Sequence, residues 1–251
     1  MVEADSLGAV PETHFDYSNL SGRPPGPVLS VAARLLPGVR KVQAQVEPYA
    51  RAWEEHNRAA VQADGPLWVV LGDSMAQGIG ASAYDRGWPG QLAERLPDHR
   101  LVNLSVSGGR LTDLLERQIP AMEALGEADL VTVVVGSNDL ISRRLREALP
   151  ARLAEVLRRL QPGSIVGTQP GGRSGALEFN RLVDEAAAER GLVIAEFRDP
   201  RMRSWKGKLS IDHFHPNDLG YAGMAEIVAE ALERSEKWCQ TLASVEVNGI
   251  N

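Results

Sequence analysis

The stretch 67-LWVVLGDSMAQGIGA-81 begins with five apolar residues and stops at Gly72. A short apolar run bounded by turn formers predicts a strand that is buried on both faces. Gly72, Asp73 and Ser74 are ordinary turn formers, so the tripeptide alone predicts a turn. A second interpretation makes Ser74 a nucleophile at the end of that strand. The rest of the chain has to decide between the two interpretations.

Four further apolar runs follow and alternate with amphipathic stretches. Strands are predicted at 101–106, 130–135, 164–168 and 192–197, and helices at 88–96, 110–125, 145–160, 174–190 and 218–237. Strand and helix in alternation predict an α/β fold, a three-layer α/β/α sandwich around a doubly wound, five-stranded parallel sheet. In such folds the functional residues follow the carboxyl ends of the strands.

The first 65 residues have a different pattern. Residues 1–27 predict an irregular lead-in, in which 21-SGRPPGP-27 has the composition of a linker. Helices are predicted at 28–36 and across 39–53, with a break near Glu47 because Pro48 follows it. We expect this N-terminal helical arm (1–65) to pack on a main domain at 66–238, which is followed by a tail at 239–251. Pairing of subunits and coverage of the site are the alternatives for the arm.

The composition narrows the function classes. The chain has 251 residues, 43% of them hydrophobic, and a net charge of −6, as in a globular protein without a nucleic-acid partner. No run of about 18 apolar residues predicts a membrane span. The N-terminus lacks the apolar segment of a secretory signal, which predicts a cytoplasmic protein, although a chain that has lost its leader gives the same pattern. The lone Cys239 is predicted to be a structural thiol.

Polar and glycine-rich clusters follow the predicted strands. Ser74 follows the first, 103-NLSVSGG-109 belongs to the second, 136-GSND-139 follows the third, and 212-DHFHPND-218 precedes the last helix. Because the carboxyl ends of parallel strands meet at one edge of the sheet, we expect these clusters to converge.

The clusters contain what a serine nucleophile requires, which is a base, a group that orients the base, and donors for an oxyanion. His215 is the candidate base, and Asp212 three residues earlier is the candidate orienting group. The N–H groups of Ser74 and of a glycine such as Gly108, together with the Asn138 amide, are candidate oxyanion donors. The site thus predicts a Ser-His-Asp triad.

This constellation resembles the SGNH/GDSL hydrolase superfamily of esterases, lipases and acylhydrolases, which is named for Ser, Gly, Asn and His in four blocks. The four blocks here are 72-GDSMAQG-78, 103-NLSVSGG-109, 136-GSND-139 and 212-DHFHP-216. The resemblance covers roughly residues 66–233. It implies a flavodoxin-like fold, a catalytic triad of Ser74, His215 and Asp212, and an oxyanion hole of Ser74, Gly108 and Asn138.

Three positions depart from the usual pattern of the superfamily. Met75 replaces a frequent Leu, Ser105 occupies the small middle position of the second block, and Gly109 beside Gly108 leaves a one-residue ambiguity in the oxyanion donor. The Gly-x-Ser-x-Gly elbow of the α/β-hydrolases does not fit, because Ala76 stands where its second glycine belongs.

The sequence therefore predicts a serine esterase or acylhydrolase that cleaves carboxylic esters, of short or acetyl acyl groups, through an acyl-enzyme. An acyltransferase or thioesterase on the same site and a non-catalytic binding domain are the alternatives. The predicted partner is a small-molecule acyl ester, no cofactor is expected, and the oligomeric state is left open.

Other residues receive supporting roles. Loops 169–175 and 199–210 are expected to form the rims of the pocket, and Trp88 and Trp205 are candidates to line it. No metal is expected, because His213 and His215 lack a third ligand at suggestive spacing. His213 is predicted to be a turn residue, and Asp73 is predicted to hydrogen-bond the local backbone.

Overall fold

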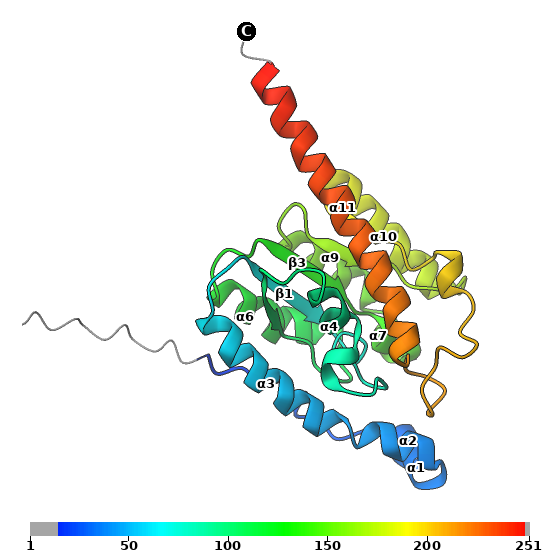
Figure 1. Ribbon diagram of the computed structural model, residues 1–251. Helices are drawn as coiled ribbons and strands as arrows, with labels where there is room; N and C mark the ends of the chain where they lie inside the picture. The colour runs from blue at the N-terminus through cyan, green and yellow to red at the C-terminus, as the bar shows by residue number, and fades with distance from the viewer. Residues whose placement is uncertain (1–14, 249–251) are drawn as a thin grey trace, which may run out of the picture.

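The computed structural model describes residues 15–248, except for the side chains of residues 27–28 and 236–248. In this part of the chain a five-stranded parallel sheet forms the centre, with the strand order β2-β1-β3-β4-β5 (Figure 1). The strands are β1 (Leu67–Gly72), β2 (Arg100–Asn103), β3 (Leu130–Val134), β4 (Ile165–Gly167) and β5 (Val193–Ala195). The predicted α/β sheet is confirmed.

Helices precede the sheet and connect its strands. They are α1 (Pro27–Leu35), α2 (Pro37–Gln43), α3 (Val46–Gln62), α4 (Trp88–Ala93), α5 (Leu111–Asp113), α6 (Ile119–Ala124), α7 (Ser137–Ile141), α8 (Arg143–Arg146), α9 (Leu149–Arg159), α10 (Ser174–Arg190) and α11 (Asp218–Asn248). A π-helical turn, η2 (Leu114–Gln118), joins α5 to α6, and 3₁₀ turns occur at η1 (Tyr84–Arg86) and η3 (Pro200–Met202). Within residues 15–248, no helix is both long and apolar enough to cross a membrane.

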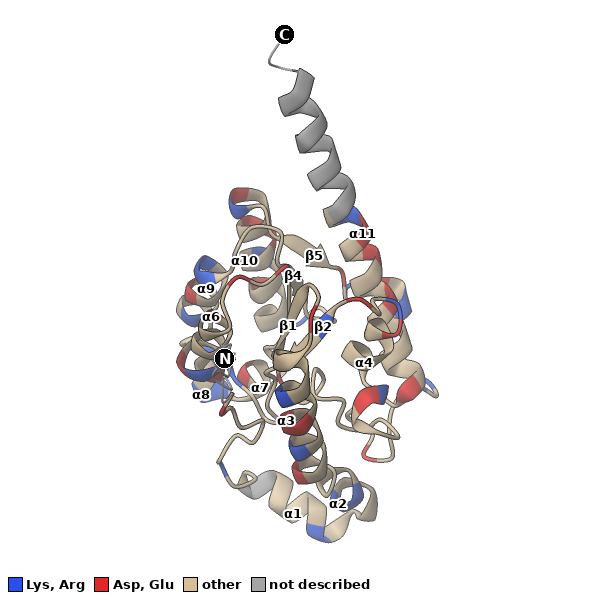
Figure 2. Ribbon diagram, turned by 60° about the vertical axis from the view of Figure 1, so that its left-hand side comes forward, with Lys and Arg blue, Asp and Glu red and all other residues tan. Residues whose placement is uncertain are grey.

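The sheet separates two hydrophobic cores. Helices α6, α9 and α10 lie on one face, and α4 and α11 lie on the other (Figure 2). Val69 and Leu71 of β1 belong to the first core, whereas Trp68 and Val70 belong to the second. Successive side chains of a strand point to opposite faces. The apolar run that starts at Leu67 is therefore continuous because both faces of β1 are covered.

Some elements end elsewhere than predicted. Strand β2 ends at Asn103, whose Oδ1 accepts hydrogen bonds from the Ser105 N–H at 3.0 Å and Oγ at 2.6 Å. The N–H groups of Leu104 and Val106 still donate to carbonyls of β1. The predicted helix 110–125 is divided at η2. Helix α11 continues past residue 237 to Asn248, because neither glycine nor proline interrupts residues 224–248.

The N-terminal arm packs along the edge of the sheet. Its break falls at Ala44–Gln45, slightly before Glu47, because Pro48 fits the first turn of α3, where a missing N–H is tolerated. Helix α3 lies beside β2, one of the two edge strands of the sheet. There the Asn57 side chain donates to the Asn103 carbonyl at 2.7 Å and accepts from the Asn103 N–H at 2.8 Å. The helix thus covers a strand edge that would otherwise be unpaired.

Candidate active site

Ser74 lies directly after β1, where glycine permits a close approach of two strands. A Cβ atom on Gly72 would lie 2.4 Å from the Val134 carbonyl oxygen of β3, too close for any other residue. The Gln118 side chain accepts from the Gly72 N–H at 2.8 Å and donates to the Gly72 carbonyl at 2.9 Å. The end of β1 is therefore fixed, and the turn presents Ser74, which is 5% exposed, at the carboxyl edge of the sheet.

The structure brings Ser74, His215 and Asp212 together. The Ser74 Oγ lies 3.0 Å from His215 Nε2, across 141 positions in the sequence. The His215 Nδ1 lies 2.6 Å from Asp212 Oδ2. The other Asp212 oxygen accepts hydrogen bonds from the N–H groups of Phe214 and His215, both at 3.1 Å. One carboxylate therefore orients both the imidazole ring and the loop that carries it.

The environment of Asp212 determines which ring nitrogen of His215 carries the proton. Burial acts to raise the pKa of Asp212, but the hydrogen bonds from His215 and from the Phe214 N–H outweigh it, so the pKa lies below its ordinary value. Asp212 is thus ionised at neutral pH and accepts a hydrogen bond from Nδ1–H of His215. The Nε2 atom is then free to accept the hydroxyl proton of Ser74.

Loop residues hold the histidine against the serine loop. Gly80 has φ +98°, and a Cβ atom there would lie 2.7 Å from His215 Cβ and 2.6 Å from the Pro216 carbonyl oxygen. The Tyr221 hydroxyl donates to the Ile79 carbonyl at 2.6 Å, so α11 is bonded to the same loop. Gly80 was not predicted as a site residue from the sequence, and its role here is to allow this close packing.

Hydrogen bonding distinguishes the two adjacent glycines of the second block. The Gly109 N–H donates to the Val106 carbonyl at 2.9 Å and closes a turn. Gly108 has φ +71° and open space around its Cβ position. Within the described part of the chain, the N–H groups of Gly108 and Ser74 have no acceptor. The geometry therefore favours Gly108 over Gly109 as a donor to a bound oxyanion.

Asn138 lies in the first turn of α7, shortly after β3, and its side chain contacts the turn that contains Gly109. Its Nδ2 donates to the Gly109 carbonyl at 2.8 Å and lies 3.5 Å from Asp73 Oδ2. An amide nitrogen has two protons, and the second contact is at the limit of a hydrogen bond. One proton therefore fixes the side chain against the glycine turn, and the other is available to a ligand.

Asp73 is adjacent to Ser74, but its carboxylate accepts hydrogen bonds from Met75 and Ser137 and not from His215. The Asp73 Oδ1 accepts from the Met75 N–H at 3.0 Å, as predicted, and Oδ2 accepts from the Ser137 hydroxyl at 2.7 Å. Burial raises the pKa of Asp73. His213, predicted to be a turn residue, has φ +57° and donates its N–H to the Ser210 carbonyl at 3.0 Å.

Asp139 is a buried carboxyl with an incomplete set of donors. It is 0% exposed, and its Oδ2 accepts from the Leu111 N–H at 3.1 Å. No donor among the described residues reaches Oδ1. Burial raises its pKa to about 6. Asp139 thus holds the start of α5.

We expect Asp139→Asn to change how stability depends on pH. Between about pH 4 and pH 6 the folded wild-type protein holds a proton that the unfolded chain loses, so the free energy of unfolding falls as the pH rises. The raised pKa corresponds to a loss of about 3 kcal/mol, at 1.36 kcal/mol for each unit. Asparagine keeps the acceptor for Leu111 and has no proton to lose. Urea unfolding at pH 4 and pH 7.5 measures the difference, and equal pH slopes in the variant and the wild type would contradict it.

A protein-family model matches the part of the chain that carries these site residues. The family model described as "GDSL-like Lipase/Acylhydrolase family" matches residues 70–222, more than half of the chain. The chain belongs to this GDSL family. It is a serine hydrolase of the SGNH/GDSL superfamily, as the sequence predicted. No curated protein matches the sequence.

Solved structures share the fold of this GDSL protein. The crystal structure of TesA is 23% identical, with a TM-score of 0.56, and the match covers 67% of this chain and 99% of that one. The psychrotrophic esterase EstA from Pseudoalteromonas sp. is 16% identical (TM-score 0.54; 69% and 98% covered). The salicylyl-acyltransferase SsfX3 from a tetracycline biosynthetic pathway is 20% identical (TM-score 0.52; 69% and 55% covered). At these identities the likeness establishes the fold alone.

A segment outside the matched GDSL region reaches the site. Both guanidinium nitrogens of Arg23 donate to Asp113, at 2.6 and 2.7 Å, and one of them also donates to the Gly108 carbonyl at 3.1 Å. Asp113 in turn accepts from the Arg110 N–H at 2.8 Å. Nearby, the buried Asn19 side chain donates to the carbonyl of Asn103, which ends β2, and to that of Ser105 just after it. The described part of the lead-in, residues 15–26, has no helix or strand, and Arg23 bonds it to the glycine turn.

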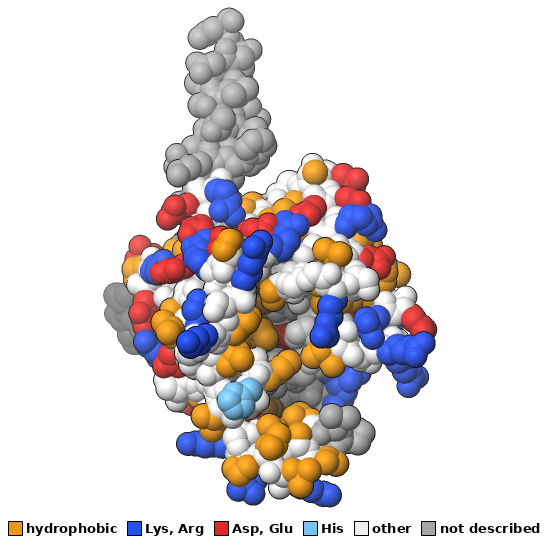
Figure 3. All heavy atoms as spheres, turned by 90° about the vertical axis from the view of Figure 1, so that its right-hand side faces the viewer, with side chains coloured by type: hydrophobic (Ala, Val, Ile, Leu, Met, Phe, Trp, Pro, Cys, Tyr) orange, Lys and Arg blue, Asp and Glu red, His pale blue; other side chains and the backbone are white. Residues whose placement is uncertain are grey.

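A cavity of about 580 Å³ opens beside Ser74 on the face drawn in Figure 3. Its lining includes Asp73 and Met75 on either side of the serine, together with Phe214 of the histidine loop. Loops 169–175 and 199–210 contribute to the lining, as predicted, and Trp205 is part of it. The prediction for Trp88 is wrong. This residue is 0% exposed, and its ring centroid lies 6.4 Å from that of Trp68 in the core.

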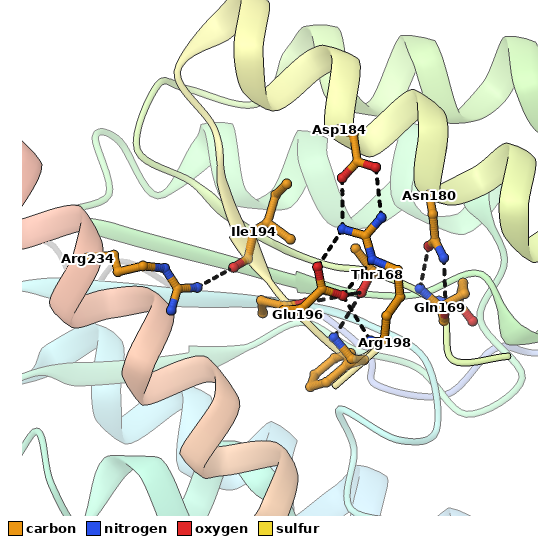
Figure 4. Close-up of polar contacts among 10 residues, drawn as sticks. Thr168, Gln169, Asn180, Asp184, Ile194, Glu196, Arg198 and Arg234 are labelled. Atoms are coloured by element: carbon orange, nitrogen blue, oxygen red, sulfur yellow. Dashed lines mark hydrogen bonds and ion pairs between the residues drawn. The ribbon is translucent and has the colours of Figure 1, made fainter. Parts of the chain in front are cut away.

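Polar contacts fix the cavity wall that follows β4 (Figure 4). The Gln169 N–H donates to Asn180 Oδ1 at 2.7 Å, and Asn180 Nδ2 donates to the Gln169 carbonyl at 2.9 Å. Thr168 donates to Glu196 at 3.0 Å, and Arg198 binds both Glu196 and Asp184. Because these bonds tie the wall to α10 and to the chain after β5, this side of the cavity is preformed.

Proposed function

We propose that the protein is a carboxylic ester hydrolase that works through an acyl-enzyme on Ser74. The observation that carries the proposal is the hydrogen-bonded chain from the Ser74 Oγ through His215 to Asp212, at 3.0 and 2.6 Å. The family assignment gives the same reaction class. The apolar cavity beside the serine supplies room for an acyl or alcohol group.

The chemistry follows from the arrangement of these groups. Ser74 attacks the ester carbonyl while its proton passes to His215 Nε2, and Asp212 stabilises the imidazolium that forms. The oxyanion is bound by the N–H groups of Ser74 and Gly108 and by the Asn138 amide. His215 then gives its proton to the leaving alkoxide. Water, activated by the same histidine, attacks the acyl-enzyme and releases the acid.

The test is turnover of 4-nitrophenyl esters with acyl chains from acetyl to decanoyl, with product analysis in the presence of an added alcohol. We expect burst kinetics and release of the free acid. Formation of a new ester in place of the acid would identify an acyltransferase on the same site. No turnover of any ester or thioester by the folded protein would refute the proposal.

Arg23 lies outside the matched family region, and we predict that its replacement lowers the activity. Replacing it with alanine removes the donor that holds the Gly108 carbonyl, so the proposed oxyanion turn is less well ordered. We expect kcat to fall about tenfold with KM nearly unchanged, because the lost contact matters for the transition state.

Two comparisons separate positioning by Arg23 from a general loss of stability. Arg51→Ala removes an exposed arginine on α3 that pairs with Glu47, and this control is expected to leave kcat unchanged. Added guanidinium ion is expected to restore part of the activity of Arg23→Ala at concentrations that leave the control unaffected. Wild-type kcat in folded Arg23→Ala would contradict this role.

A further inference from the structure

Basic side chains collect at the mouth of the cavity although the chain as a whole is acidic, with a net charge of −6. Arg146, at the end of α8, and Arg173, just before α10, belong to the lining. Figure 3 shows the hollow with hydrophobic side chains at its edge and Lys and Arg side chains on both sides of it. Asp73 is the one carboxyl group among the described residues that line the cavity.

These two arginines have no carboxylate partner, in contrast to two arginines of the chain that follows β5. Arg198 binds Asp184 and Glu196, and Arg201 binds Asp199 and Glu230. Neither Arg146 nor Arg173 makes a side-chain hydrogen bond or an ion pair among the described residues. Their guanidinium groups are therefore free to bind an anion from solution. Guanidinium groups bind carboxylates and phosphates through two parallel hydrogen bonds.

The charge balance inside the cavity favours an anion. The carboxyl of Asp73 is occupied by donors from Met75 and Ser137, and burial raises its pKa, which weakens its competition for the arginines. Arg173 also precedes the 17-residue helix α10, whose first turn has no side-chain cap and whose dipole adds to the same positive field.

The remaining walls of the cavity are mostly apolar. They include Val134, Leu140, Phe197, Met202, Trp205 and Met224. Such walls accommodate an alkyl chain or a ring, and charges act more strongly at an apolar surface than in bulk water. The cavity lining thus combines the two neighbours of the proposed nucleophile, apolar walls and two exposed, unpaired cations.

We propose that this cavity binds an ester whose apolar body ends in an anionic group, which pairs with Arg146 and Arg173. This inference rests on the proposed ester hydrolysis at Ser74 and specifies its substrate class. The anion, a carboxylate or a phosphate, belongs either to the acyl group or to the alcohol, and these two sources give different results in the test.

The test compares charged and neutral esters of matched shape. For the acyl side, mono-4-nitrophenyl esters of adipate, suberate and sebacate are compared with 4-nitrophenyl alkanoates of equal chain length. For the alcohol side, the butanoyl ester of 3-hydroxy-4-nitrobenzoate is compared with that of 2-nitrophenol. We expect kcat/KM for the charged member to exceed that of its neutral partner by about tenfold or more in one of the two series. We expect added salt to reduce this preference.

Variants assign the preference to the two arginines. In Arg146→Gln/Arg173→Gln the preference for the charged ester is expected to disappear, while kcat/KM for the neutral ester stays within about twofold. Arg158→Gln/Arg181→Gln is the matched control, since it removes two exposed arginines that pair with Glu155 and Glu185 away from the cavity. This control is expected to keep the preference.

The outcomes separate the two proposals. Neutral esters hydrolysed through Ser74 without any preference for charged ones would overturn the anion site and leave the esterase intact. A preference that survives in Arg146→Gln/Arg173→Gln would also overturn it. Turnover that persists in Ser74→Ala would instead overturn the proposed function itself.

Discussion

Ser74→Ala is expected to lower kcat for ester hydrolysis on the order of 10⁶-fold, the size of effect known for removal of a triad serine. The Ser74 Oγ makes the hydrogen bond to His215 Nε2 through which the proton would leave. Alanine removes the atom that forms the acyl-enzyme and leaves the backbone N–H that serves the oxyanion. Residual catalysis is therefore expected to come from the oxyanion donors and from substrate binding alone.

The fold of this variant is expected to be unchanged, because alanine fits the space of a serine and the turn is fixed by Gly72 and Gln118. The thermal unfolding midpoint and KM for a short ester are the controls. A folded Ser74→Ala protein with turnover within tenfold of the wild type would exclude Ser74 as the nucleophile.

Asp212→Asn is expected to lower kcat by about 10⁴-fold. The Asp212 Oδ2 accepts from His215 Nδ1 at 2.6 Å, which leaves Nε2 as the acceptor for the serine proton. An asparagine amide can donate to Nδ1 instead, which favours the tautomer with the proton on Nε2. That tautomer cannot take the proton of Ser74.

The matched control is Glu185→Gln, which removes a half-exposed carboxylate on α10 that pairs with Arg181 away from the cavity. It is expected to change kcat less than twofold. The measurement is kcat at saturating ester from pH 6 to pH 9, together with fluorophosphonate labelling rates. A loss below tenfold in Asp212→Asn would mean that another group orients His215.

The sequence predicted the fold because its signals are local. Each strand is a short apolar run, and in β1 both faces are buried, so the run has no polar interruption. The candidate triad could also be predicted, because Ser74, Asp212 and His215 belong to short sequence blocks placed after strands. The position of Gly72 at the end of the run indicated where the first of these blocks would lie.

Other features depend on contacts between residues that are distant in the sequence, and no local sequence pattern predicts such contacts. Arg23 meets Asp113 across 90 positions, and a Pro-rich lead-in gives no hint of this contact. Trp88 was expected to line the pocket, but the packing of α4 on the sheet directs it into the core beside Trp68. The choice between Gly108 and Gly109 required the hydrogen bond from Gly109 to Val106.

The role of the two cavity arginines was missed for a related reason. Arg146 lies in an arginine-containing stretch that looks like ordinary solvated surface. Arg173 belongs to the loop 169–175, which was expected to form a rim of the pocket, but its charge was given no role. Only the fold brings the end of α8 and the start of α10 to one opening. The neutral and charged esters described above therefore test a property that the sequence alone did not reveal.

The central claim is that Ser74 is a nucleophile activated by His215. Its most direct test is labelling of the intact protein with a fluorophosphonate, followed by peptide mass mapping. We predict one phosphonyl group per chain on the peptide that contains Ser74, none in Ser74→Ala, and slow labelling in His215→Ala. A label on a different residue, or full ester turnover by protein that remains unlabelled, would contradict it.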